Sequence, residues 1–104
     1  MRFLYDSKGK HIANETNGQL HATSGKNIGH YMESHKFFID MSGRYLGELY
    51  NNNRLLYRMG NGYEHVSFGN YGNYGNIGNY GNPGNIGNSG MPAGYKDILE
   101  EKLK

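Results

Sequence analysis

The chain has 104 residues, the size of one small domain, and its formal net charge is +2. It contains no cysteine, which excludes disulfides and thiolate metal sites. The small net charge gives no reason to expect a nucleic-acid partner. The first six residues reach a charge too early for a signal peptide, and no apolar run is long enough to span a bilayer. The expected location is therefore cytoplasmic.

The first two-thirds of the chain contain four copies of one short pattern. Each copy has a polar or aromatic residue, then a branched apolar residue, then a small one, at 11–13, 27–29, 45–47 and 65–67. A pair that begins with an apolar residue precedes each copy, at 4–5, 20–21, 38–39 and 55–56. A glycine turn separates pair and copy, at Gly9, Gly25, Gly43 and Gly60. The repeat predicts four strand–turn–strand units built to one plan.

The turns have the residues of tight chain reversals. Asp6 and Asp40 stand where a type I turn uses a side-chain acceptor, and the glycines supply a positive φ. Between the units the chain reverses at Asn17-Gly18, near 33–35 and at 51–53. Hairpins this short are not stable alone, so we expect an all-β domain in which four β-hairpins close into a pseudo-fourfold ring.

The units at 6–13, 25–29, 40–47 and 60–67 together resemble the 4-fold beta flower family. The resemblance covers about residues 1–68, and the fourth unit departs from it in having a longer turn. It implies a shallow square β-structure with a central apolar channel. It also implies a small binding domain without enzymatic activity, whose shape invites comparison with Tubby-like lipid-binding barrels.

Two sets of side chains fall at equivalent repeat positions and are the candidate ligand-binding residues. Three cations directly follow turn glycines and would share one rim, where they could meet lipid headgroups, phosphate or an acidic protein. Four apolar residues would form a ring on the short strands, and the small residues after them a second ring on the opposite face. The candidates are Lys10, Lys26, Arg44, Ile12, Ile28, Leu46 and Val66.

Each of these assignments has a structural alternative. Exposed turns are usually polar, so the cations can simply keep the turns hydrated. Crowding near an axis would favour small residues whether or not a ligand binds, and this alternative is preferred over a ligand channel.

The polar residues do not indicate an enzyme or a metal site. His30 and Glu48 share a repeat position, but two good ligands are fewer than a structural zinc site needs. Nucleophile-elbow and phosphate-loop motifs are absent from the sequence. We therefore expect no catalytic residues, no metal and no cofactor.

After Phe68 the sequence changes to seven consecutive Gly-Asn-x triplets, which end at Ser89. Residues 69–94 are interpreted first as a flexible linker, because glycine raises chain entropy and asparagine buries little surface. The alternative is a tract whose Tyr and Ile residues dock along a sheet edge, self-associate or thread toward the centre of the ring. Residues 95–104 place Tyr95, Ile98, Leu99 and Leu103 at helical spacing and predict a short amphipathic helix.

The sequence thus predicts a four-hairpin domain at 1–68, a tract at 69–94 and a helix at 95–104. The leading function is a non-catalytic binding or adaptor module for a membrane lipid or a small apolar ligand. The alternative is a structural protein that self-assembles through the Gly-Asn-x tract. The expected partners are accordingly a lipid surface, a protein that binds the C-terminal helix, or a second copy of the chain.

Overall fold

The chain folds into a closed β-barrel with an added edge strand, which confirms the all-β class. The computed structural model describes residues 1–78 and 81–104. Seven strands follow one another antiparallel in chain order, and β1 meets β7 in parallel through Tyr5 and Arg54. An eighth strand pairs antiparallel with β7. The strands are β1 (Arg2–Tyr5), β2 (His11–Thr16), β3 (Gln19–Ala22), β4 (Asn27–Met32), β5 (Phe37–Asp40), β6 (Tyr45–Tyr50), β7 (Arg54–Arg58) and β8 (Tyr95–Asp97).

The tight turns form where their residues predict them. Asp6 accepts hydrogen bonds from the backbone N–H groups of Lys8 and Lys10, both at 2.9 Å, and Asp40 accepts two equivalent bonds in its own turn. Asn17 and Gly18 both have positive φ, at 51° and 80°, as a two-residue hairpin turn requires. The Asn17-Gly18 turn joins β2 to β3, and a further tight turn, closed by the bond from Gly25 N–H to the Ala22 carbonyl at 2.9 Å, joins β3 to β4. Local turn chemistry thus accounts for the three hairpins that contain the glycine turns: β1–β2, β3–β4 and β5–β6.

The three hairpins share a β-bulge at the same place. The register shifts as Leu4 pairs with Ala13 but Tyr5 pairs with His11, which leaves Ile12 as an extra residue. Ile28 and Leu46 are the extra residues of the second and third hairpins. A bulge breaks the alternation of side chains along a strand. As a result Ala13 and Ile28 belong to one buried cluster, and the expectation that the small residues face the opposite side from the apolar ones is wrong.

The fourth hairpin does not form as the sequence predicts. Ser67 makes a single bridge to Arg44, while β7 takes β8 as its partner. In the third hairpin, Ile39 of the first strand pairs with Tyr45, the first residue of the short pattern. Leu56 occupies the same place as Ile39 in the fourth unit, and its partner is Asp97. The repeat at 65–67 was the wrong partner for β7 because the chain leaves the sheet after β7 and returns to it only at β8.

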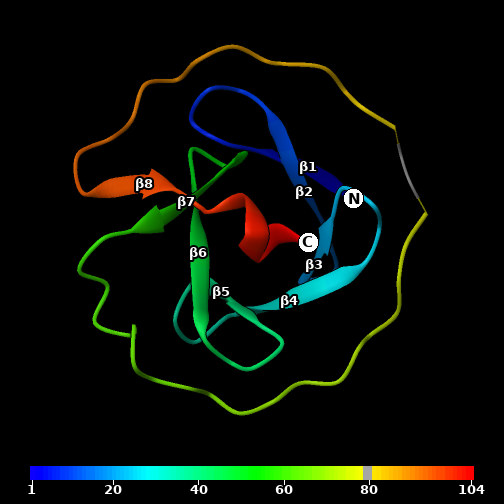
Figure 1. The fold of residues 1–104 in the computed structure, drawn as a ribbon, viewed down its shortest axis with the longest axis vertical. Coiled ribbons are helices and arrows are strands. Elements are labelled where there is room, and N and C mark those ends of the chain that lie inside the picture. Colours follow the sequence, from blue (N-terminus) through cyan, green and yellow to red (C-terminus); the bar gives the residue numbers. More distant parts are fainter. Residues whose placement is uncertain (79–80) are drawn as a thin grey trace.

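The predicted helix at 95–104 is also wrong. Residues Tyr95–Asp97 form β8, and only Glu100–Leu103 form a helical turn, the 3₁₀ helix η1. Ten residues are too few for a stable isolated helix, and the edge of β7 offers backbone partners to the first three of them. Figure 1 shows η1 near the centre of the view, over one end of the barrel.

Apolar side chains pack on both faces of the sheet. The barrel interior holds Leu4, Leu20, Phe38 and Leu55, each fully buried. On the outer face Phe37, Ile39 and Tyr45 form a second cluster. Tyr63, Phe68 and Tyr71 from the segment after β7 cover this outer cluster, so part of the Gly-Asn-x tract is packed against the sheet.

The segment after the fourth turn runs around the outside of the barrel until it reaches β8 (Figure 1). We call residues 68–94 the belt; within it, residues 79 and 80 lie outside the described residues. Three belt N–H groups donate to the carbonyls of three turn glycines. Phe68 donates to Gly43 at 2.9 Å, Ile77 to Gly25 at 2.8 Å, and Ile86 to Gly9 at 3.1 Å. These donors are nine residues apart, which is three triplets.

The belt asparagines explain the triplet itself. Asn73, Asn82, Asn85 and Asn88 each accept a hydrogen bond from the N–H of the glycine two residues on, at 2.6 to 2.8 Å. Along its described length the belt has no neighbouring strand, and these side-chain bonds satisfy backbone N–H groups that would otherwise lack a protein partner. The belt is therefore bonded to itself and to the barrel, and the preferred interpretation of a flexible linker is wrong for its described residues.

Candidate functional site

The apolar candidates come together at the end of the barrel beside η1, which we call the mouth. Ile28 and Leu46 are buried in the interior cluster, and Ile12 packs against it. Val66 is elsewhere, with 38% of its surface exposed. Ile98 occupies the interior cluster instead, together with Leu103. Sequence reasoning missed these two because their spacing was assigned to a helix, although Asp97-Ile98 repeats the polar–apolar step of the other short strands.

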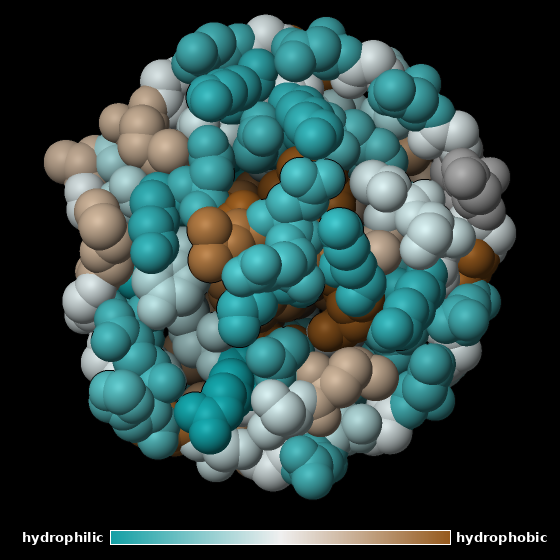
Figure 2. Space-filling view, in the orientation of Figure 1, coloured by the Kyte–Doolittle hydropathy of each residue, from teal (hydrophilic) through white to brown (hydrophobic). Residues whose placement is uncertain are grey.

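Residues 98–104, which we call the plug, cover the mouth. Ile98 and Leu103 insert into the interior cluster, whereas Leu99 through Lys102 and Lys104 are exposed. Among the described residues no hydrogen bond or ion pair joins 99–104 to the barrel, and the backbone bond from Lys102 to Leu99 stays inside the plug. The plug is thus held mainly by two apolar side chains. Figure 2 shows hydrophobic surface at the centre of this face, partly covered by hydrophilic residues.

Three grooves flank the plug, and each contains one predicted cation and one bulged apolar residue. The first, of about 280 Å³, contains Lys10 and Ile12. The second, of about 300 Å³, contains Arg44 and Leu46. The third, of about 320 Å³, is lined by Lys26 and Ile28. Residues of the plug form the inner wall of each groove, so the three grooves surround it.

The mouth carries charges of both signs. Lys10, Lys26 and Arg44 are exposed, and in the part of the chain that the structure describes they make no ion pair. Asp6 and Asp40 lie in the same grooves, where they accept the backbone hydrogen bonds of their turns. Glu100 and Glu101 lie on the plug. Lys102 and Lys104 of the plug also line these grooves. The mouth therefore presents an apolar centre with mixed charges around it, and its cations come from both the barrel and the plug.

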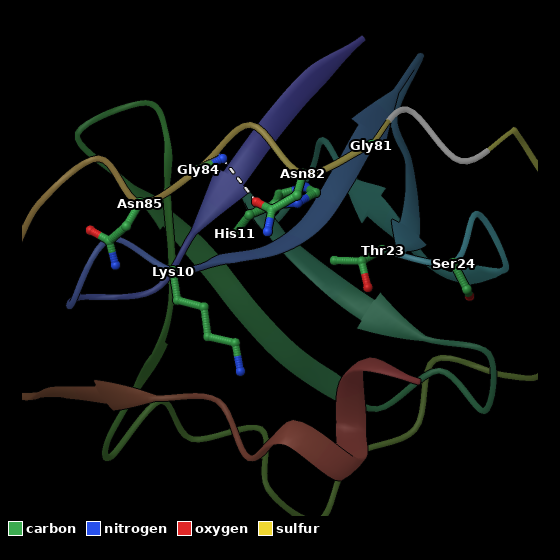
Figure 3. Close-up of a pocket in the computed structure, with 8 residues that line it drawn as sticks. All are labelled: Lys10, His11, Thr23, Ser24, Gly81, Asn82, Gly84 and Asn85. Atoms are coloured by element: carbon green, nitrogen blue, oxygen red, sulfur yellow. Dashed lines mark hydrogen bonds between the residues drawn. The ribbon is translucent and has the colours of Figure 1, made fainter.

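A second hollow lies between the belt and the barrel (Figure 3). It has a volume of about 610 Å³, and its lining is polar: Lys10, His11, Thr23, Ser24, Gly81, Asn82, Gly84 and Asn85. In Figure 3 the Lys10 side chain points away from Asn82 and Asn85. Lys10 also lines the first groove of the mouth, so this residue borders both spaces.

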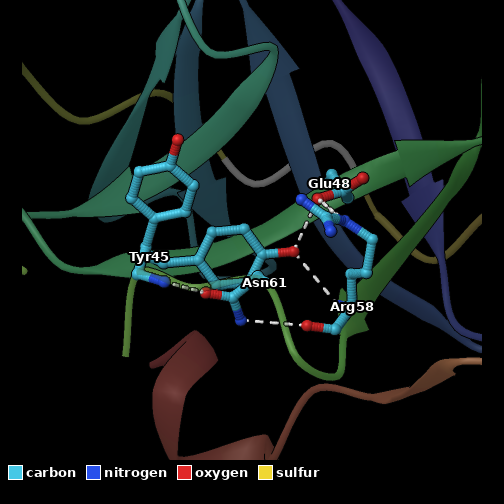
Figure 4. A network of polar contacts seen from close by, with 5 residues as sticks. Tyr45, Glu48, Arg58 and Asn61 are labelled. Atoms are coloured by element: carbon cyan, nitrogen blue, oxygen red, sulfur yellow. Dashed lines mark hydrogen bonds and ion pairs between the residues drawn. The ribbon is translucent and has the colours of Figure 1, made fainter. Parts of the chain in front are cut away.

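A polar network beside the mouth ties β6 to β7 (Figure 4). The Tyr45 hydroxyl donates to Glu48 at 2.7 Å and accepts from the Arg58 backbone N–H at 3.1 Å. The Arg58 guanidinium donates to the same Glu48 oxygen at 3.1 Å. Burial, together with the nearby Glu48 carboxylate, raises the pKa of Tyr45 above its usual range. The Tyr45 hydroxyl and Oε2 of Glu48 are both occupied by protein partners, so this network links the two strands.

His30 and Glu48, which share a repeat position, are not brought to one site. Nδ1 of His30 lies 2.6 Å from Oε1 of Gln19, and its ring packs on Tyr71 and Tyr74 with centroid distances of 4.8 and 5.0 Å. Burial lowers the pKa of His30. Within 1–78 and 81–104 no group of three or more His, Cys, Asp or Glu side chains is arranged to hold a metal ion.

Comparison with known proteins gives no relative. No family model matches the chain, and neither a curated protein nor a solved structure matches it. The resemblance to the 4-fold beta flower family consequently stays an expectation from the repeat. In the described residues, no helix has the length and apolar character needed to cross a membrane.

Proposed function

We propose that this protein is a non-catalytic binding module whose mouth binds an anionic membrane lipid. The proposal includes the four-unit plan of the 4-fold beta flower family, with β7 and β8 as the fourth unit. The pairing of Asp97 with Leu56 supports that plan, because it repeats the pairing of the third hairpin. A cytoplasmic location stays a prediction.

One observation carries the proposal: three separate grooves each combine an unpaired cation with an apolar side chain around one centre. Such pairs suit an amphiphile, since the cation attracts an anionic headgroup and the apolar residue accepts the start of a chain. The cation and the apolar residue share a groove in all three hairpins because their spacing is the same. Each cation precedes its bulged residue by two positions.

The plug has to move for a lipid chain to reach the interior cluster. Its hold on the barrel consists mainly of Ile98 and Leu103, and η1 has no side-chain cap. A short segment with few polar bonds to its surroundings opens at low free-energy cost. Leu103 therefore marks the position that the apolar part of a ligand would take.

The test is flotation of the full chain with vesicles of phosphatidylcholine alone and of phosphatidylcholine with phosphatidylserine. The unmodified chain should float with the anionic vesicles and detach as salt is raised. The triple variant Lys10→Gln, Lys26→Gln and Arg44→Gln should bind roughly 100-fold more weakly, because each cation near an anionic surface contributes about 1 kcal/mol.

A matched control removes the same charge elsewhere. The variant Arg2→Gln, Lys8→Gln and Lys36→Gln loses three exposed cations that line none of the three grooves. It should retain most of the binding. If both variants lose vesicle binding equally, the interaction depends only on net charge and not on the grooves. If the unmodified chain does not float with anionic vesicles, the lipid proposal is rejected.

A further inference from the structure

Everything after the fourth turn belongs to one continuous arm, residues 63–104, which contains the belt, β8 and the plug. Its long-range hydrogen bonds go to the barrel. Tyr74 N–H donates to Oδ1 of Asn27 at 2.9 Å, and Asn27 N–H donates to Oδ1 of Asn76 at 3.1 Å. The Arg54 guanidinium donates to the Gly87 carbonyl at 3.0 Å. The arm thus runs around the barrel and bonds to it rather than folding on itself, as its course in Figure 1 also shows.

The barrel recognises the arm at repeated stations. The turn glycines Gly9, Gly25 and Gly43 are buried beneath the arm, and a Cβ on any of them would collide with arm backbone. At two stations a second bond follows the first by one triplet, from Tyr71 to Met41 and from Ser89 to Ser7. The stations consist of backbone groups at hairpin turns, so the barrel of any other copy of the chain presents the same stations.

A short hinge connects the barrel to the arm. Gly60 and Gly62 are exposed, have positive φ of 69° and 84°, and would have nothing near an added Cβ. Between them the Asn61 side chain donates to the Arg58 carbonyl and accepts from Tyr63 N–H, so its bonds are local. Glycines on both sides let the hinge adopt other directions without steric cost.

From these features we infer that the arm is an exchangeable docking element and that its partner is a second copy of this chain. In the exchanged dimer each arm occupies the stations, the β7 edge and the mouth of the other barrel. The contacts are those of the closed monomer, and only the hinge differs. Gly-rich segments with a short repeat specify their register weakly, which favours such exchange. This inference goes beyond lipid binding and does not depend on it.

A second copy fits better than a foreign peptide for a physical reason. The arm ends in β8 and the plug, which complete the sheet edge and the interior cluster. A peptide that matched only the Gly-Asn-x stations would leave the β7 edge and the mouth open. Only another arm of this chain satisfies all three regions at once.

The first experiment uses the absence of natural cysteine. Full-length Ser7→Cys and Ser89→Cys chains are mixed, unfolded, refolded together at high concentration and oxidised. Ser89 N–H donates to the Ser7 carbonyl at 2.8 Å, so the two introduced thiols meet only when one chain's arm lies on the other's barrel. Disulfide-linked heterodimers should form, whereas chains refolded separately and then mixed should give several-fold fewer.

Chance collision is controlled by mixing Ser34→Cys with Ser89→Cys under the same conditions. Ser34 is exposed on the turn between β4 and β5, and its hydroxyl bonds to the neighbouring His35 ring. Cross-linking of the Ser7→Cys mixture that does not exceed this control would overturn the inference.

Light scattering of the unmodified chain gives an independent measurement. After refolding, the dimer-to-monomer ratio should rise roughly three- to tenfold for each tenfold rise in chain concentration. Gly62→Pro should raise the dimer fraction further, because proline cannot adopt the φ of 84° that the closed hinge uses. A monomer at every concentration, with a far-ultraviolet dichroism spectrum that shows a folded chain, would also overturn the inference.

Discussion

At the scale of single residues, glycine does two separate jobs in this chain. Gly18 serves only its own turn, since an added Cβ there would meet nothing within 4 Å. Gly25 has a similar positive φ, but an added Cβ would also collide with the Ile77 carbonyl of the belt. Both positions therefore need glycine for the positive φ of a turn. Gly25 needs it for a second reason, because the belt passes too close for any side chain.

This difference predicts unequal costs for the same substitution. Gly18→Ala should lower the free energy of unfolding by about 1 kcal/mol, which is the cost of a left-handed conformation at alanine. Gly25→Ala should cost about 1–3 kcal/mol more, because it also breaks the bond from Ile77 and displaces the belt. Urea unfolding measures both, and equal losses would mean that the belt contributes nothing at this station.

At the scale of elements, the hairpins show how far local sequence reaches. Asp6, Asp40 and the bond from Gly25 N–H to the Ala22 carbonyl close turns within a few residues, and the three hairpins β1–β2, β5–β6 and β3–β4 follow from them. The fourth unit failed because β7 and β8 are joined through the whole belt. His65-Val66 and Asp97-Ile98 both fit the repeat, and local pattern cannot choose between partners that differ only in position along the chain.

The same limit applies to the candidate site. Six of the seven predicted ligand-binding residues lie around the mouth because they occur in the three local hairpins. The seventh, Val66, was placed by the unit that does not form. Whether these residues bind a ligand stays a prediction.

The plug is the element whose removal should be most informative. Leu103→Ser removes one of its two buried anchors and should expose the mouth while the barrel stays folded. If the plug and a lipid compete, flotation with anionic vesicles should strengthen by up to about tenfold. Leu99→Ser makes the same chemical change at a residue that is 57% exposed, and it should have little effect. Weaker flotation of Leu103→Ser alone would mean that the plug belongs to the binding surface.

At the scale of the whole molecule, the belt makes stability depend on pH. Burial lowers the pKa of His30, which lies beneath Tyr71 and Tyr74. The unfolded chain therefore binds a proton more readily than the folded chain, and stability falls as pH drops below about 6.5.

Glu15 affects stability at a lower pH than His30. Burial would raise its pKa, but the Gly18 amide and Arg2 outweigh burial and lower it, so its contribution is lost on further acidification.

The free energy of unfolding should therefore decline in the unmodified chain as the pH falls below about 6.5, the ordinary pKa of histidine. His30→Gln cannot take up a proton, so its stability should be flatter in this range. His65→Gln, at an exposed histidine, should keep the decline. Urea unfolding at several pH values distinguishes these outcomes, and an unchanged slope in His30→Gln would assign the effect to other groups.

The sequence by itself determined the all-β class, three of the hairpins and the turn residues that build them, because these features depend on bonds between near neighbours. Only the tertiary structure decided the partner of β7, the course of the belt and the presence of the plug. These features depend on which distant segment best satisfies an open strand edge, a row of turn carbonyls and an apolar mouth. Such choices are settled by packing of the complete chain and not by the preference of any one segment.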